Sequence, residues 1–311
     1  MGRYVARRLA QSIIVVIGVS LLVFIILYQT GDPVALMASQ EATQEDIERM
    51  RENLGFNRPW YVQYLDFASG AIRGDFGTSL RQQQPVFELI MDRVPATLRL
   101  SLAAFILSIA ISIPVGIISA TKRNSIWDNL VMGGALLGQS LPVFFLGVVL
   151  IWIFAGQLKW FPSFGQGDGS PVSMLKHLAL PAFTLATFSL ARSARLVRSS
   201  MLEVLGHDYV RTARAKGLTE RMVLYRHALK NALIPVVTIF GLEFGTLLGG
   251  AVITETVFAW PGVGRLVVLA IQQRDFPVVV GAVTILAMLF VLINLAVDLL
   301  YGVIDPRVRY S

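Results

Sequence analysis

The sequence predicts an all-α polytopic membrane protein with six transmembrane helices. Fifty-five per cent of its 311 residues are hydrophobic and only 15% are charged, whereas a soluble domain carries about a quarter charged residues. Crossing a hydrocarbon core of about 30 Å takes about 20 apolar residues, and six stretches are long enough. The predicted spans are Leu9–Thr30, Ala96–Ala120, Asn129–Ala155, Leu178–Val197, Ala232–Phe258 and Pro277–Tyr301.

The first span follows three arginines, Arg3, Arg7 and Arg8. Its apolar stretch is too long for a secretory signal peptide, and no small-residue cleavage pattern occurs before Asp32 and Pro33. We therefore expect it to remain as an anchor. Together with the segment that follows it, it forms a predicted N-terminal unit, residues 1–94.

The segment from Gly31 to Pro95 is predicted to lie on the outer side of the membrane, opposite the cytoplasm. It holds ten acidic and six basic residues, which is acceptable because long loops obey the positive-inside rule weakly. Thr43 precedes a predicted amphipathic helix that stops at Gly55. A second helix is expected after it, with Pro59 in its first turn. Residues 73–86 are polar and rich in turn residues, which predicts a loop.

The second, third and fourth predicted spans each contain a proline. Lys122 and Arg123 follow the second span and place that end in the cytoplasm. Proline removes a backbone donor and can kink a helix, so we expect kinks at the prolines in or near spans. These are Pro114, Pro142, Pro181, Pro235 and Pro277.

A basic stretch, residues 192–233, separates the fourth and fifth spans. It carries nine Lys or Arg against three acids, so it is predicted to face the cytoplasm. Its pattern predicts two amphipathic helices, Glu203–Lys216 and Leu218–His227, hinged at Gly217. From the residues alone, two interpretations remain open: the stretch docks a protein, or it rests on anionic lipid.

Two carboxylates in the fifth span are candidates for the transport path, because ionisable groups inside a bilayer are costly. Glu243 lies near the middle of the span, where it lines a path or pairs with a basic residue of a neighbouring helix. Glu255 lies near the outer end, where a solvated or helix-terminal role is the alternative. The next stretch is predicted as a turn-rich loop with Trp260 at the membrane interface. Residues 303–311 form a cytoplasmic tail, so both termini are predicted to be cytoplasmic.

No catalytic or metal-binding motif is present in the sequence. It contains no Gly-x-x-x-x-Gly-Lys-Ser/Thr loop for nucleotide phosphates and no His-Glu-x-x-His motif. Cysteine is absent, and the three histidines are scattered. The net charge of +7 comes from residues at span ends and does not require nucleic acid. We therefore predict that this chain has no catalytic residue, metal site or nucleotide site of its own.

Residues His207–Pro235, HDYVRTARAKGLTERMVLYRHALKNALIP, resemble the cytoplasmic loop of a known family. The family is the dipeptide/oligopeptide branch of ABC-importer permeases, and the resemblance is to the first of its two membrane subunits. Four other stretches also resemble this family, so the resemblance covers essentially the whole chain. They are MGRYVARRLAQSIIVV, RVPATLRLSLAA, GQSLPVFFLGVVL and GGAVITETVFAWPGVGRL.

The resemblance implies a type I ABC-importer permease fold over residues 95–302, in the inner membrane of a bacterium or archaeon. It implies four partners: a second permease subunit, two cytoplasmic ATPases that bind ATP and Mg, and an extracytoplasmic substrate-binding protein. The cytoplasmic segment 198–232, which we call the coupling loop, would contact the ATPases. Its predicted contact residues are Arg211, Ala213, Gly217, Leu218, Arg221, Met222, Tyr225 and Arg226.

The coupling loop departs from the Glu-Ala-Ala motif of such importers. Aligning Gly217 places Arg211, Thr212 and Ala213 at the Glu-Ala-Ala positions. Leu229 and Lys230 stand at the later Leu-Pro positions, so only Ala213, Gly217 and Leu229 match directly. This departure affects the individual contacts more than the family resemblance.

Three alternatives remain on the sequence. The same type of subunit serves importers of nickel, glutathione or oligosaccharides. An ion-coupled secondary carrier would use Glu243 as a proton or cation site, but the spans show no evident inverted repeat. A membrane-embedded enzyme would need a catalytic grouping, which the sequence does not display.

Overall fold

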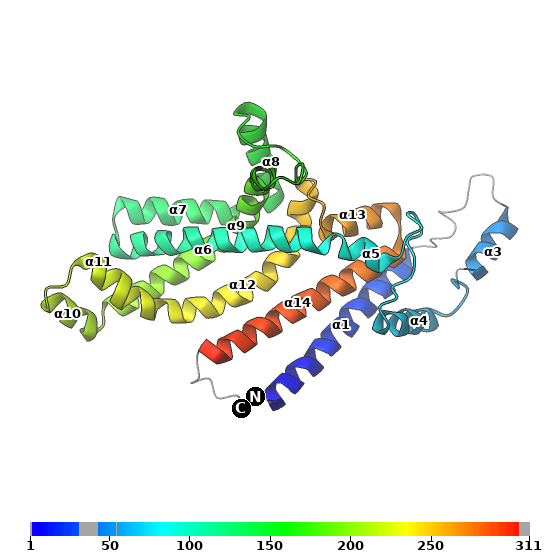
Figure 1. Cartoon of the computed structure of the whole chain (residues 1–311), viewed down its shortest axis with the longest axis horizontal. Helices are drawn as coiled ribbons and strands as arrows, with labels where there is room; N and C mark the ends of the chain where they lie inside the picture. The colour runs from blue at the N-terminus through cyan, green and yellow to red at the C-terminus, as the bar shows by residue number, and fades with distance from the viewer. Residues whose placement is uncertain (1, 31–42, 54, 305–311) are drawn as a thin grey trace. The chain divides into compact units, whose positions relative to one another are not determined.

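The computed structural model describes residues 2–30, 43–53 and 55–304. Residues 31–42, Leu54 and most of the predicted tail, with Arg307 and Arg309, fall outside the described residues. Every regular element within the described ranges is a helix (Figure 1), which confirms the predicted all-α class. The elements are α1 (Gly2–Thr30), α3 (Gln44–Asn53), α4 (Trp60–Ile72), α5 (Val86–Met91), α6 (Val94–Thr121), α7 (Ile126–Ser140), α8 (Val143–Leu150), the π-helix η1 (Ile151–Gln157), α9 (Pro171–Leu205), α10 (Asp208–Ala215), α11 (Glu220–Met222), the π-helix η2 (Val223–Ala228), α12 (Leu229–Val257), α13 (Val263–Gln273) and α14 (Phe276–Ile304).

The described residues contain up to six membrane spans by length and apolar composition. Four helices qualify alone, and two bent helix pairs qualify if each pair counts as one span. The single helices are Arg7–Gln29, Val86–Thr121, Pro171–Leu205 and Phe276–Asp298, and the pairs are Ile126–Ser140 with Val143–Gln157 and Glu220–Val237 with Ile239–Val257. These segments correspond in order to the six predicted spans.

The third span is broken at Pro142, one of the prolines at which a kink was predicted. α7 and the helix that starts at Val143 meet at 106°. Leu141 between them is extended, with φ −80° and ψ 135°. A residue before proline is pushed out of the helical region by the proline ring, so Pro142 accounts for the break.

The other prolines do not end their helices. Pro114, Pro181 and Pro235 lie inside α6, α9 and α12, and Pro277 is the second residue of α14, where its missing donor costs nothing. The α12 span bends by 46° just beyond Pro235. Of the kinks predicted at prolines, the one at Pro142 is a break in the span and the one near Pro235 is a bend.

The chain divides into two compact units. The first holds Met1–Ala96 and Pro261–Leu295, and the second holds Thr97–Trp260 and Ala296–Pro306. In the first unit α4 packs on α1, where the hydroxyl oxygens of Tyr64 and Ser20 are 3.0 Å apart. The Phe24 and Tyr64 rings meet edge to face at 5.6 Å.

The predicted helix after Thr43 is confirmed as α3. The Asp46 amide donates to the Thr43 hydroxyl at 3.3 Å, and the Thr43 amide donates to the Asp46 carboxylate at 3.1 Å. This reciprocal pair satisfies amides that a helix start leaves without partners. Gly55 beyond the helix has φ +73°, a conformation that suits glycine after a helix end.

A buried carboxylate organises the loop of residues 73–86. Asp275, which is 1% exposed, accepts the Ser79 hydroxyl at 2.5 Å and the Leu80 amide at 3.1 Å. The Arg81 amide donates to it at 3.3 Å. Since these groups belong to one unit and to segments about 195 residues apart, Asp275 ties this loop to the turn between α13 and α14.

We expect Asp275→Ala to loosen this loop. The substitution leaves the Ser79 hydroxyl and two backbone amides without their acceptor, and one unsatisfied buried donor costs about 1–3 kcal/mol. Hydrogen exchange at the Leu80 and Arg81 amides should accelerate at least tenfold. Asp92→Ala removes an exposed carboxylate and is the matched control. Unchanged protection of both amides in Asp275→Ala would show that the carboxylate does not hold the loop.

The turn-rich loop predicted over Ala259–Leu266 was wrong in its second half. Val263–Leu266 begin α13 (Val263–Gln273). Trp260, before this helix, is 0% exposed, and its amide donates to the Glu255 carbonyl at 2.8 Å. Leu266, Val267 and Ala270 form the buried face of α13, a helical spacing that the flanking glycine and proline residues obscured.

The second unit brings α6 and α9 close together. A Cβ atom added at Gly116 would lie 2.6 Å from Val197 Cβ and 2.9 Å from the Ala194 carbonyl oxygen. The hydroxyls of Ser108 and Ser189 are 2.8 Å apart in the same interface. Small and hydroxyl-bearing residues of this kind allow close packing of membrane helices.

Candidate functional site

The coupling loop is a helix–turn–helix at one end of the second unit (Figure 1). α9 ends at Leu205, and α10 starts at Asp208. After Gly217, Thr219 precedes α11, which runs through η2 into α12 without a break. Asp208 in the first turn of α10 and Arg214 in its last turn both complement the helix dipole.

Gly217 forms the predicted hinge. Its φ is +77°, and its amide donates to the Arg214 carbonyl at 2.9 Å. Nothing lies within 4 Å of a Cβ atom added at this position. The requirement for glycine is therefore conformational, because a left-handed backbone costs other L-residues about 1–2 kcal/mol.

The predicted helix bounds around the hinge were partly wrong. Glu203, predicted to start the first helix, lies inside α9, and the break falls at Gly206 and His207. The second helix does not end at His227, because η2 continues directly into α12. The second loop helix is therefore an extension of the fifth span, whereas α10 is a separate short helix between two turns.

An apolar core seats the coupling loop on the ends of three long helices. Val210 and Val223 are fully buried, and Ala213 is 6% exposed. They belong to one cluster with Ala228 of η2 and with residues of α6, α9 and α12: Ile117, Ala120, Val197, Met201, Val204, Ala232, Val236 and Phe240. Each buried valine contributes about 1.5–3 kcal/mol, so the loop and the helix ends form one packed body.

The second loop helix has a predicted apolar face made of Leu218, Met222 and Tyr225. This face is exposed only in part. Met222 is 41% and Tyr225 is 56% exposed. Leu218, predicted to share this face, is half-buried and packs against the core cluster. Ala213 also lies in the core. Two of these four residues are thus accessible to a partner, and two support the loop from beneath.

Basic residues accompany the exposed face. Arg211, Arg221 and Arg226 are exposed, and Arg211 lies 3.5 Å from the Asp208 carboxylate. A pair that sequence reasoning missed spans the hinge: Arg214 donates to both oxygens of Glu220, at 2.7 Å to Oε1 and 3.1 Å to Oε2. Both side chains are about half exposed, so the pair contributes at most about 1 kcal/mol.

The two carboxylates of the fifth span are buried within the second unit. Glu243 is 3% exposed, and its Oε2 accepts the Ser193 hydroxyl of α9 at 2.6 Å. Among the described residues no hydrogen-bond partner faces Glu243 Oε1. Glu255, for which a solvated role was the alternative, is 0% exposed and accepts the Thr97 hydroxyl at 2.6 Å. Hydroxyl partners on neighbouring helices therefore hold both carboxylates.

Comparison with known proteins gives a consistent assignment. Residues 112–310 match the family described as binding-protein-dependent transport system inner membrane component, and residues 1–102 match its N-terminal family. The dipeptide transport system permease protein DppB of Alkalihalophilus pseudofirmus is 44% identical, and that of Escherichia coli K12 is 42% identical. The oligopeptide transport system permease protein AppB of Bacillus subtilis is 44% identical. All of this chain and all of each relative are covered.

The fold is also found among solved structures. An inward-facing structure of the methionine ABC transporter MetNI matches with a TM-score of 0.56 at 21% identity, over 70% of this chain and 96% of the other. A second crystal form gives a TM-score of 0.58 at 20% identity. At this identity the likeness concerns the fold, and it confirms the expected ABC-importer permease architecture. The chain belongs to the family of inner membrane components of binding-protein-dependent transport systems, whose members are membrane permeases and not themselves catalytic.

Proposed function

We propose that this chain is one of two permease subunits of an ATP-driven importer of dipeptides and oligopeptides. The observation that carries the proposal is the coupling loop: a hinged helix pair with exposed Met222 and Tyr225, seated on the ends of the spans. Relatives 42–44% identical over the full chain are named as dipeptide and oligopeptide permeases. Together these observations support the function and the substrate class.

The partner of the coupling loop would be a cytoplasmic ATPase. Tyr225 and Met222 on one helical segment suit a helix-in-groove contact, in which apolar side chains enter a hydrophobic groove. Arg211, Arg221 and Arg226 would surround the contact and set its orientation. ATP and Mg would bind to the partner ATPases, because this chain has no phosphate-binding loop.

Force would pass from the loop to the membrane through its core. Val210 and Val223 pack against the ends of α6, α9 and α12, and packed interiors move as units rather than deform. ATP-driven closure of the partners would therefore shift these helix ends. The chain would then change between inward-facing and outward-facing states according to the differential affinity of the ATPases for the two states.

The proposed orientation places both termini and the coupling loop in the cytoplasm. Six spans then put the segment before α6 and the turn between α13 and α14 on the outer side. The bonds from Ser79 and Leu80 to Asp275 support this topology, since they require those two segments to share a side. An extracytoplasmic binding protein would deliver the ligand on that side, and a second permease would complete the path.

We retain the three-part division proposed from the sequence: residues 1–94 as anchor and outer segment, 95–302 as permease domain and 303–311 as cytoplasmic tail. Glu243 and Glu255 remain the proposed path residues. Because both are buried between helices, either carboxylate would meet a ligand only when α12 separates from its neighbour. The free amino group of a peptide would suit Glu243, whose Oε1 is not hydrogen-bonded among the described residues.

Uptake of a labelled dipeptide into cells that carry the complete system tests this proposal. We expect ATP depletion to stop uptake and collapse of the proton gradient at constant ATP to leave it unchanged. Competition by unlabelled dipeptides, but not by nickel, glutathione or an oligosaccharide, would identify the substrate class. Uptake that follows the proton gradient would instead favour the ion-coupled carrier.

A further inference from the structure

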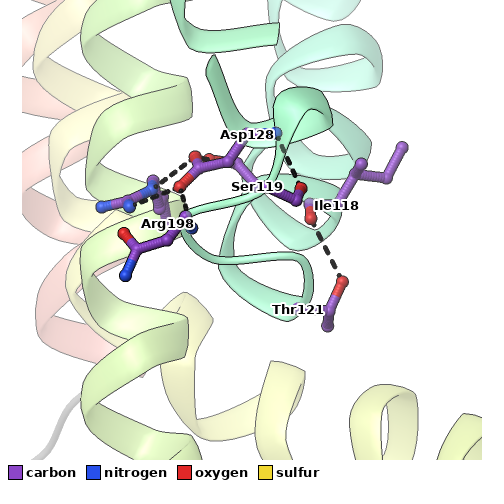
Figure 2. Close-up of polar contacts among 7 residues, drawn as sticks. Ile118, Ser119, Thr121, Asp128 and Arg198 are labelled. Carbon is purple, nitrogen blue, oxygen red and sulfur yellow. Dashed lines mark hydrogen bonds and ion pairs between the residues drawn. The ribbon is translucent and has the colours of Figure 1, made fainter. Parts of the chain in front are cut away.

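The carboxylate of Asp128 joins three helices of the second unit (Figure 2). It lies in the first turn of α7 and is 4% exposed. Ser119 of α6 donates its hydroxyl to this carboxylate, and the backbone amide of Asn124, in the turn between α6 and α7, donates at 3.0 Å. Arg198 of α9 donates through Nε at 3.0 Å and through Nη2 at 2.8 Å.

These bonds form two independent halves. Ser119 and Asn124 hold the carboxylate to the end of α6 without help from α9. Arg198 adds a two-bond contact to α9, and such paired guanidinium–carboxylate bonds fix orientation as well as distance. Removing the arginine should therefore free α7 from this contact while the turn between α6 and α7 keeps its own hydrogen bonds.

The position of the pair connects the coupling loop to the broken span. Arg198 lies in the last turns of α9, between the core residues Val197 and Met201 on which the coupling loop packs. Asp128 lies in the first turn of α7, and α7 ends at the 106° break before Pro142. A second, exposed contact supports the same helix pair near that break, where Arg195 donates to the Gln139 side chain at 3.0 Å.

Stability alone is a weak explanation for this ion pair. The Asp128 side chain is 6% and the Arg198 side chain 28% exposed. Replacing an ion pair taken out of water by apolar residues of similar volume is often neutral or stabilising, because desolvation offsets the attraction. An apolar contact would not fix the angle and register of α7 against α9 as the paired bonds do. The geometry is suited to positioning one helix relative to another.

We propose that the Arg198–Asp128 pair is a positioning link that makes α7 follow α9 when the coupling loop moves. The link carries loop displacement to the break at Leu141 and Pro142, and so to the broken third span. The inference rests on the proposed ATP-driven function and adds a route for the coupling. It predicts that losing the pair separates ATP hydrolysis from transport rather than stopping both equally.

Three variants and one control test the link in the reconstituted complete complex. Arg198→Ala removes the contact to α9 and keeps the bonds from Ser119 and Asn124, but it leaves the buried carboxylate without its cation. Asp128→Ala/Arg198→Ala removes both charges, together with the acceptor of those two donors. Arg198→Lys keeps the charge but loses the two-bond geometry. Arg123→Ala removes an exposed cation from the same turn and is the matched control.

Peptide uptake per ATP hydrolysed is the first measurement. We expect it to fall about tenfold in Arg198→Ala and in the double variant, within the range of typical coupling energies, with assembly of the complex retained. Arg198→Lys should lie between the double variant and the intact complex, and Arg123→Ala should match the intact complex. Unchanged uptake per ATP in the double variant would overturn the proposal, as would an equal loss of hydrolysis and uptake. An intact complex without ATP-dependent uptake would contradict the proposed function itself.

A distance measurement tests the link directly. The chain lacks cysteine, so Leu130→Cys in α7 and Ser199→Cys in α9 place spin labels at two exposed positions without background labelling of this chain, which is labelled before the complex is assembled. With the ion pair present, the interlabel distance should stay constant when a non-hydrolysable ATP analogue is added. In Asp128→Ala/Arg198→Ala it should shift or broaden on addition. A shift of equal size in both backgrounds would show that the pair does not join the helices.

Discussion

Replacing Gly217 with proline is expected to abolish ATP-dependent peptide uptake while the chain remains in the membrane. Proline fixes φ near −65°, whereas Gly217 has φ +77°, so the turn between α10 and α11 cannot form as observed. Proline also removes the amide that donates to the Arg214 carbonyl. The exposed segment with Met222 and Tyr225 would then lose its direction relative to α10.

Two milder substitutions separate conformation from volume at this hinge. Space around Gly217 is open, so a side chain fits and only the backbone conformation is penalised. Asparagine tolerates the left-handed region better than alanine, so Gly217→Asn should retain more uptake than Gly217→Ala. Uptake should be compared at equal amounts of the chain in the membrane. Normal uptake by Gly217→Pro would refute the role of the hinge in coupling.

Replacing Met222 and Tyr225 together by aspartate is expected to release the ATPase from the purified complex. Met222 is 41% and Tyr225 56% exposed, and neither belongs to the core cluster beneath the loop, so the change should leave the fold of the chain intact. Desolvated aromatic anchors at an interface often contribute 2 kcal/mol or more, and a carboxylate in an apolar groove adds a desolvation cost. We expect affinity for the ATPase to fall at least thirtyfold, about 2 kcal/mol.

Two controls identify the cause of such a loss. Tyr225→Phe keeps the ring and should keep the ATPase bound. Val223→Asp places a charge in the core beneath the loop, where Val223 is 0% exposed, and should lower the melting temperature of the chain. If the double aspartate variant retains the ATPase and the melting temperature of the intact chain, the exposed face is not the docking surface.

Local features of the fold were predictable because neighbouring residues determine them. The start of α3 follows from Thr43 and Asp46 three residues apart, which hydrogen-bond each other's backbone. The left-handed turn at Gly217 follows from glycine between two amphipathic patterns. The spans themselves follow from their apolar length.

Long-range partners were not predictable from local patterns. Four prolines have different outcomes: Pro142 breaks a span, whereas Pro114, Pro181 and Pro235 remain inside helices. Asp275 is buried by a loop about 195 residues earlier in the sequence. No pattern near such a residue indicates its distant partner.

The candidate site was predictable in outline for the same reason. Gly217, Met222 and Tyr225 stand where the amphipathic pattern placed them, at the hinge and on the exposed face. Ala213 and Leu218 turn inward because α9 and α12 supply a core for them. The sequence spacing predicted which residues share a helix face, but it did not predict which of them are buried. The Arg198–Asp128 link joins residues 70 positions apart, and only the packing of α7 against α9 reveals it.

The first measurement should show whether this chain is a permease subunit that binds a cytoplasmic ATPase. The chain is purified under mild detergent from its native membrane, and mass spectrometry identifies the proteins that accompany it. We predict that a second permease and a cytoplasmic ATPase accompany it, and that the ATPase is lost when Met222 and Tyr225 are replaced by aspartate. A chain that purifies alone and transports in vesicles without ATP would contradict the account, and Glu243 would then be the residue to examine as an ion site.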